Sequence, residues 1–231
     1  FDRIASQVFP NATILIPSAD SEPFLARMPL ILDACERYDL YLDVYTNATL
    51  LNTDRLEAIR TRLYKLQISF DSHKKDVYEK IRAGARFEEV LSNVEETLAY
   101  ASQTNLYPVA VAVFMTLNMD HLPEYMEFIR GLGFRFAWIQ RLLHIAPGTE
   151  KLDPFLACPA ERVEKAVARA TEAAQSCGIN LTVDLGEGPP PVGTLQAVGQ
   201  FFLLGRVPVM VLISIFAMSL WAISITANHF L

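Results

Sequence analysis

Apolar runs alternate with helical periodicities along most of this chain. Runs rich in Val, Ile, Leu, Phe and Tyr predict strands near residues 13–17, 41–46, 66–70, 109–116, 136–142 and 179–185. Apolar residues at helical spacing predict helices near residues 1–9, 24–37, 54–64, 86–103, 121–132 and 159–177. Because the strands are apolar on both faces and are separated by helices, they indicate a parallel sheet with right-handed crossovers.

Polar side chains gather where the predicted strands end. In a β/α barrel the carboxyl ends of all strands open on one face, where a ligand is held. We therefore expect the strand ends to form one ligand site, lined by Glu22, Thr46, Asn47, Ser69, Asp71, Asn118 and Gln140. Several coordinated clusters of this kind are hard to explain as loop composition alone.

Each candidate has a functional and a structural interpretation. Glu22, fixed before Pro23, could accept hydrogen bonds from a ligand ammonium group, or could be an acid favoured at a helix start. Ser69 and Asp71 alternate around one residue, so both face the same side. Arg82, in a helix-to-loop stretch, could bind a ligand carboxylate or be a surface cation.

Composition and charge narrow the classes of function that this chain could have. The chain has 231 residues, a net charge of −6 and no basic stripe, which argues against a nucleic-acid-binding surface. Its four histidines share no metal-ligand spacing, and its three cysteines fit buried or surface thiols in a reducing compartment. No nucleophile–base pair or phosphate-cradling glycine loop stands out. The polar residues at the strand ends therefore suit the binding of a zwitterionic ligand with hydroxyls, and they do not form a complete catalytic apparatus by themselves.

The last part of the chain differs from the rest. Prolines and glycines in "GEGPPPVG" indicate a linker over 186–206. Residues 207–227 contain no charged side chain and match the ~30 Å hydrocarbon core, so they predict a single transmembrane helix; a buried core helix is the alternative. Arg206 weakly favours a cytoplasmic position for the globular domain.

Four segments, in order and spacing, resemble the radical S-adenosylmethionine (SAM) family, especially the subgroup that often carries a cysteine-rich SPASM-type extension. They are "SADSEPFL", "VYTNATLL", "QISFDSHKKDVYEKIRAGARFEEVLSNV" and "VFMTLNMDHLPEYMEFIRGLGFRFAWIQ". "SEPFL" stands where the family has Gly-Gly-Glu-Pro, and "TNATLL" where it has Thr-Asn-Gly. The resemblance covers about residues 5–185 and implies an α/β fold, a partial (β/α)6 TIM-like barrel.

The resemblance also implies a cofactor and roles for the candidates. Glu22 would bind the methionine amino group of SAM, and Ser69 and Arg82 its ribose and carboxylate side. Asp71, Asn118 and Gln140 would line the same cleft. The family cleaves SAM reductively at a [4Fe-4S] cluster, with electrons from a donor, and the resulting radical abstracts a hydrogen from a small-molecule or peptide substrate.

Two departures from the family pattern qualify this expectation. The CxxxCxxC motif that binds the cluster is not in this sequence, and Asp20 and Ser21 replace the two glycines before Glu22. Because the chain begins with Phe1 inside a predicted helix, we interpret it as a truncation that lacks the first β/α unit. The alternatives are a degenerate, membrane-anchored scaffold and an unrelated β/α-barrel enzyme working without iron.

Overall fold

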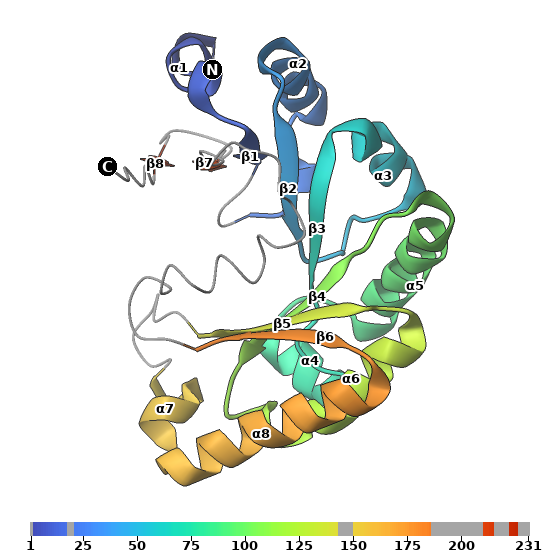
Figure 1. Cartoon of the computed structure of the whole chain (residues 1–231), viewed down its shortest axis with the longest axis vertical. Helices are drawn as coiled ribbons and strands as arrows, with labels where there is room; N and C mark the ends of the chain where they lie inside the picture. Colours follow the sequence, from blue (N-terminus) through green and yellow to red (C-terminus); the bar gives the residue numbers. More distant parts are fainter. Residues whose placement is uncertain (1, 18–20, 143–149, 186–209, 215–221, 226–231) are drawn as a thin grey trace. The chain divides into compact units, whose positions relative to one another are not determined.

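In the computed structural model, the described residues are 2–17, 21–142, 150–185, 210–214 and 222–225. The chain divides into two units. Figure 1 labels their helices and strands. The first unit consists of Phe1–Ser69, Glu89–Pro108 and Val207–Leu231, and the second consists of Phe70–Glu88 and Val109–Arg206.

Parallel strands form the centre of the first unit. They are β1 (Ile14–Ile16), β2 (Tyr41–Thr46) and β3 (Leu63–Ser69), with β2 between the other two. Val44 of β2 lies opposite Leu66 of β3, and both side chains are fully buried. Burial of such aliphatic side chains contributes about 1.5–3 kcal/mol each to stability, which explains why these runs form the interior strands.

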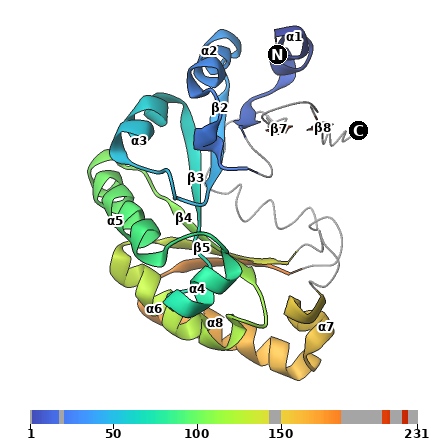
Figure 2. The same cartoon turned by 180° about the vertical axis from the view of Figure 1, so that it is seen from behind.

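The first unit has one helix before its strands and further helices that follow them and cover one side of the sheet (Figures 1 and 2). They are α1 (Asp2–Val8), α2 (Met28–Tyr38), α3 (Thr53–Ile59) and most of α5 (Phe87–Thr104), with short 3-10 turns at Phe9–Asn11, Pro23–Leu25 and Arg60–Arg62. Helix α3 begins after Asn52, whose side chain accepts a hydrogen bond from the Arg55 N–H at 3.0 Å. Ile31, Cys35 and Leu56 are almost completely buried, so α2 and α3 contribute apolar side chains to the core.

The second unit has its own set of parallel strands. They are β4 (Val109–Phe114), β5 (Phe136–Arg141) and β6 (Asn180–Asp184), with β5 between the other two. Ala112 of β4 lies opposite Ile139 of β5, and both are buried. Val113 and Gln140 form the next pair, point to the other face and are only half buried.

Helices α6 (Leu122–Leu132) and α8 (Ala160–Cys177) pack against each other along β5 and β6 (Figure 1). Glycines end both helices: Gly133 has φ of 114° and Gly178 has φ of 77°, in the left-handed region that favours glycine. The remaining elements of this unit are α4 (Lys75–Ile81), α7 (Pro154–Ala157) and the 3-10 turns at Met119–His121 and Glu150–Leu152.

The described parts of 207–227 do not form the predicted helix. Strands β7 (Met210–Ser214) and β8 (Ala222–Ile225) pair antiparallel to each other, and β7 pairs parallel with β1. A short apolar run rich in Val and Ile suits a strand as well as a helix, and periodicity cannot separate the two. Among the residues that the structure describes, no helix is long and apolar enough to cross a membrane. The linker over 186–206 lies outside the described residues, and membrane attachment stays a prediction.

The α/β class is confirmed, with some shifts in the element boundaries. The strand predicted near 66–70 already starts at Leu63, where the helix prediction of 54–64 ran too far. The helix predicted from residue 24 starts at Met28, because Pro23–Leu25 forms a separate 3-10 turn. The first shift occurs where apolar Leu63 suits both a helix and a strand.

Candidate functional site

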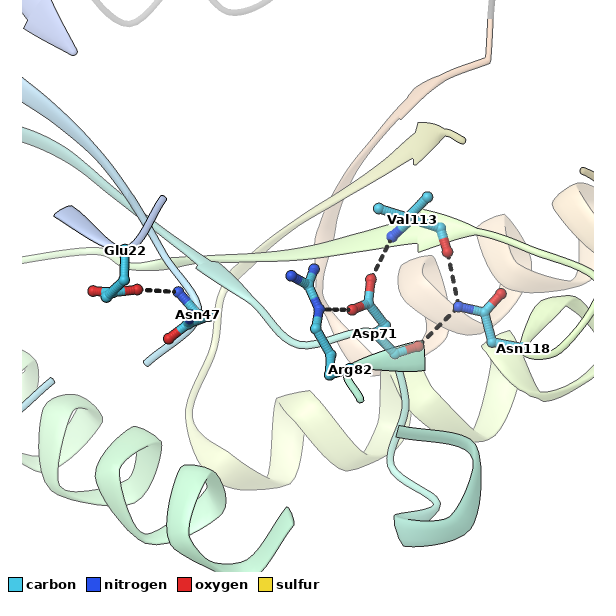
Figure 3. Close-up of polar contacts among 6 residues, drawn as sticks. All are labelled: Glu22, Asn47, Asp71, Arg82, Val113 and Asn118. Atoms are coloured by element: carbon cyan, nitrogen blue, oxygen red, sulfur yellow. Dashed lines mark hydrogen bonds and ion pairs between the residues drawn. The ribbon is translucent and has the colours of Figure 1, made fainter. Parts of the chain in front are cut away.

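Glu22 lies directly before the Pro23–Leu25 turn, and its carboxylate is nearly buried and hydrogen-bonded within the first unit. The residue is only 8% exposed. Thr46 donates its hydroxyl hydrogen to Oε1 at 2.7 Å. The Asn47 N–H donates to Oε2 at 2.8 Å, the contact drawn in Figure 3. The end of β2 therefore fixes the orientation of a nearly buried acid.

Burial also alters the protonation of this acid. Removal from water raises the pKa of Glu22, while the hydrogen bonds from Thr46 and Asn47 and the charge of Arg55 act in the opposite direction. The Arg55 guanidinium lies 5.8 Å from the centre of the Phe24 ring. A ligand ammonium group beside Glu22 would favour its charged form, so this position is suited to bind one.

The loop after Thr46 has an unusual backbone. Ala48 has φ of 60°, which is uncommon for a residue with a side chain, and it occupies the place of the glycine in the Thr-Asn-Gly pattern. Its N–H donates to the Thr46 hydroxyl oxygen at 3.0 Å, and Asn93 donates to its carbonyl at 2.8 Å. These bonds hold the turn, and with it the Asn47 N–H that contacts Glu22.

Asp71, Arg82 and Asn118 form a connected network in the second unit, which we call the Asp71 network. The Arg82 Nε donates to Asp71 Oδ2 at 2.5 Å, and the Val113 N–H donates to Asp71 Oδ1 at 2.8 Å. The Asn118 amide nitrogen donates to the carbonyls of Asp71 and Val113, each at 2.9 Å, and its oxygen accepts from the Met115 N–H. Figure 3 shows this chain of contacts.

Charge and burial are unevenly distributed in the Asp71 network. The Asp71 side chain is fully buried, whereas the Arg82 side chain is 29% exposed. Burial opposes the charge on Arg82, but the neighbouring Asp71 carboxylate prevails and raises the pKa of the guanidinium. Arg82 therefore stays cationic with one side against Asp71 and the other toward the surface.

The remaining predicted site residues lie on strands. Ser69 is the last residue of β3 in the first unit, and it is half buried. Gln140 on β5 lies opposite Val113 on one side and Asp184 on the other. The structure thus joins both Arg82 and Asn118 to Asp71, and it joins Glu22 to Thr46 and Asn47.

A layer of polar side chains on β2 and β3 was not predicted. In the register of the two strands, Asp43 lies opposite Lys65 and Tyr45 opposite Gln67, so all four point away from the buried aliphatic face. Gln67 donates to Asp43 Oδ1 at 2.7 Å, and burial raises the pKa of Asp43. The alternation of Lys65, Gln67 and Ser69 along β3 is the sequence signal that marks this polar face.

The structure contains a second ion pair with a buried acid, besides Asp71–Arg82, and the sequence did not predict it. Arg141, at the end of β5, donates to Asp153 Oδ2 at 3.1 Å, and its guanidinium lies 4.6 Å from the centre of the Phe155 ring. Asp153 is fully buried and also accepts from the Phe155 N–H at 2.9 Å, which starts α7. The pair fixes the turn before α7 to the carboxyl end of β5.

The described part of the chain contains no group of three His, Cys, Asp or Glu side chains that could hold a metal ion. Cys35 is fully buried, and this burial raises the pKa of its thiol to about 11. A thiol with that pKa stays protonated at neutral pH, whereas cluster ligands are thiolates.

Comparison with solved structures identifies the fold. SuiB from Streptococcus suis, bound to precursor peptide SuiA, is 15% identical with a TM-score of 0.59, and the match covers 87% of this chain and 43% of SuiB. The enzyme anSMEcpe with bound AdoMet is 12% identical with a TM-score of 0.58, covering 80% and 54%. A radical SAM methyltransferase from Sphaerobacter thermophilus is 18% identical with a TM-score of 0.51, covering 80% and 55%.

These likenesses show that the chain has the fold of radical SAM enzymes, and the resemblance predicted from the sequence is confirmed at that level. The chain spans about half the length of these proteins, or less. No model of a known protein family matches the chain, and no curated protein matches it.

Proposed function

We propose that this chain binds S-adenosylmethionine as part of a radical SAM enzyme. The observation that carries the proposal is the buried Glu22 carboxylate, held by Thr46 and Asn47 on a fold shared with radical SAM enzymes. SuiB has been solved bound to S-adenosylmethionine, and anSMEcpe with bound AdoMet, which supports the same ligand for this chain.

Glu22 is proposed to bind the ammonium group of the ligand. Its two oxygens accept hydrogen bonds from the Thr46 hydroxyl and the Asn47 and Phe24 N–H groups, and a carboxylate has about four lone-pair sites in all. The free lone pairs can accept from an ammonium group, which supplies three donors. The ammonium charge would also compensate the burial that raises the pKa of Glu22.

The resemblance implies that Ser69 and Arg82 contact the ribose and carboxylate side of the ligand, and we propose that Arg82 binds the carboxylate. A guanidinium binds a carboxylate through two parallel N–H groups, which gives both strength and orientation. Gln140 is kept as a proposed contact. Asn118 is 2% exposed and its amide is bonded to backbone groups, so we propose that it supports the site and does not touch the ligand.

The iron–sulfur cluster of the family does not fit this chain's own residues. The three cysteines do not have the CxxxCxxC spacing, and Cys35 is buried with a protonated thiol. Reductive cleavage of SAM and the choice of substrate are therefore proposed only for a protein that supplies cluster ligands from other sequence, and no step is assigned to residues of this chain.

Calorimetric titration of the chain with S-adenosylmethionine tests the proposal. The Glu22→Gln variant keeps the shape of the side chain but removes the charge, and we expect its affinity to fall by about 10–100-fold, since hydrogen bonds to charged groups contribute about 1.5–3 kcal/mol. Glu164→Gln, at an exposed position on α8, is the matched control and should bind like the unmodified chain.

Two results would count against this function. Absence of binding by the unmodified chain would reject the proposed ligand. Equal affinities of the unmodified chain and Glu22→Gln would reject the role of Glu22. Turnover of a substrate by this chain without S-adenosylmethionine would instead support the alternative of an iron-independent β/α-barrel enzyme.

A further inference from the structure

Asp71 lies behind Arg82, and both of its carboxylate oxygens already have protein partners. Oδ1 accepts from the Val113 N–H at 2.8 Å, and Oδ2 accepts from the Arg82 Nε at 2.5 Å. The side chain is fully buried. With this geometry Asp71 has little access to a ligand. It can affect ligand binding most directly through its neighbour Arg82.

Among the described residues, the side chain of Arg82 has a hydrogen-bond partner at one atom only, Nε. It follows α4, and its backbone N–H donates to the Tyr78 carbonyl at 2.8 Å, which fixes the main chain at the helix end. In the described part of the chain, its side chain bonds to Asp71 through Nε, and both Nη groups project away from this contact (Figure 3). The two Nη groups together offer four N–H donors in a plane, which matches the two oxygens of a carboxylate.

An aromatic cluster lies near this pair, since the charges of Asp71 and Arg82 both act on Tyr78. Phe70, the residue before Asp71, packs against Tyr78 and Phe87, with ring centres 5.3 and 5.9 Å apart. Such apolar surroundings strengthen the attraction between the Asp71 carboxylate and the guanidinium, because little water screens the charges. The ion pair therefore restricts the directions in which Arg82 can point.

Two tyrosine hydroxyls complete the buried side. The hydroxyls of Tyr78 and Tyr125 are inaccessible and have no hydrogen-bond partner among the described residues. Burial raises the pKa of Tyr78 to about 12, with the charge of Arg82 lowering it and that of Asp71 raising it, and burial raises the pKa of Tyr125 as well. Both hydroxyls therefore remain protonated, and they add no competing negative charge near Arg82.

We propose that Asp71 is a positioning residue, which holds Nε of Arg82 so that the two Nη groups bind the carboxylate of an amino-acid-bearing ligand. The inference rests on the proposed function, because the ligand is S-adenosylmethionine in both. It assigns Asp71 a role through Arg82, in place of the direct ligand contact predicted from the sequence. A purely structural ion pair is the competing interpretation.

The test compares two ligands that differ in the amino-acid part. 5′-Methylthioadenosine has the nucleoside of S-adenosylmethionine but no carboxylate. Asp71→Asn should weaken binding of S-adenosylmethionine by about 10-fold or more, and should change binding of 5′-methylthioadenosine less than 2-fold, because only the former needs an oriented Arg82. Asp76→Asn, exposed at the start of α4, is the matched control and should leave both affinities unchanged.

A double-mutant cycle separates positioning from an independent effect. If Asp71 acts through Arg82, the Asp71→Asn/Arg82→Lys double variant should bind S-adenosylmethionine no more weakly than Arg82→Lys alone. Additive losses would overturn the inference, as would equal losses for the two ligands. Should Asp71→Asn fail to fold, Asp71→Glu keeps the charge but displaces Nε, and the same selective loss is expected.

The outcomes also distinguish this inference from the proposed function. If the unmodified chain does not bind S-adenosylmethionine, the proposed function fails first. If it binds, and both Asp71 variants bind equally well, only the positioning role is overturned.

Discussion

Asp71 Oδ1 accepts a hydrogen bond from the Val113 N–H at 2.8 Å, although 42 positions separate the two residues in the sequence. The bond joins the segment after β3 to β4, and Asn118 adds a second connection through the carbonyls of the same two residues. One carboxylate thus ties together the backbone around the predicted ligand residue Arg82. Changes in this network should alter both the stability of the protein and its binding of ligand.

Replacing Asn118 by Ala should destabilise the protein by about 2–3 kcal/mol. The buried amide serves two carbonyls and one N–H, and its removal leaves these groups without partners. Urea unfolding followed by circular dichroism measures the change. Asn180→Ala, at an exposed position on β6, should change stability by no more than about 0.5 kcal/mol. Similar small effects for both variants would mean that the Asn118 bonds contribute little.

Binding of S-adenosylmethionine should weaken as the pH falls through the raised pKa of Glu22. Only the charged carboxylate accepts hydrogen bonds from the ligand ammonium on all its lone pairs, so protonation removes the interaction. Because burial raises this pKa above 4.5, the loss should begin at a higher pH than for an exposed glutamate. Calorimetric titrations across this pH range should show the loss for the unmodified chain and for Glu164→Gln. A Glu22→Gln variant with the same pH dependence would contradict the assignment.

Asp43 should make the folded state less stable as the pH rises. Burial raises the pKa of Asp43 above its usual value of 3.8, so the folded state binds its proton more tightly than the unfolded state does. The stability contribution is present below the unfolded pKa and is lost as the pH rises through the raised, folded pKa. Urea unfolding at a series of pH values should show a weaker decline for Asp43→Asn, which can still accept the hydrogen bond from Gln67. An unchanged pH dependence would show that Asp43 titrates normally.

The ion pairs Arg141–Asp153 and Arg162–Asp120 should differ in their contribution to stability. Asp153 is fully buried, whereas the side chains of Arg162 and Asp120 are 54% and 48% exposed. We expect Asp153→Ala to destabilise the protein by about 2–4 kcal/mol, because Arg141 loses its ion pair with Asp153 and α7 loses the acceptor for the Phe155 N–H. Asp120→Ala should have an effect below about 1 kcal/mol. Unfolding free energies from urea titrations measure both, and equal values would contradict the role of burial.

Local periodicity was enough to identify most elements of the fold. The strand runs at Tyr41–Thr46, Val109–Phe114 and Phe136–Arg141 are found where the sequence predicted them. Their boundaries were less certain, because residues such as Leu63 suit a helix end and a strand start equally well. The apolar stretch at 207–227 was harder still, since length and hydrophobicity do not distinguish one long helix from the short strands at Met210–Ser214 and Ala222–Ile225.

The amino-acid sequence by itself determined the α/β class, the radical SAM-like fold and the identity of Glu22 and Arg82 as candidate ligand residues, because periodicity and local motifs depend only on neighbouring positions. Only the tertiary structure decided which hydrogen-bond partners these side chains have. It gave Glu22 the partners Thr46 and Asn47, and it gave Asp71 the Arg82 guanidinium and the Val113 N–H. Burial and hydrogen bonding between residues far apart in the chain depend on how strands and helices pack, and no local pattern contains that information.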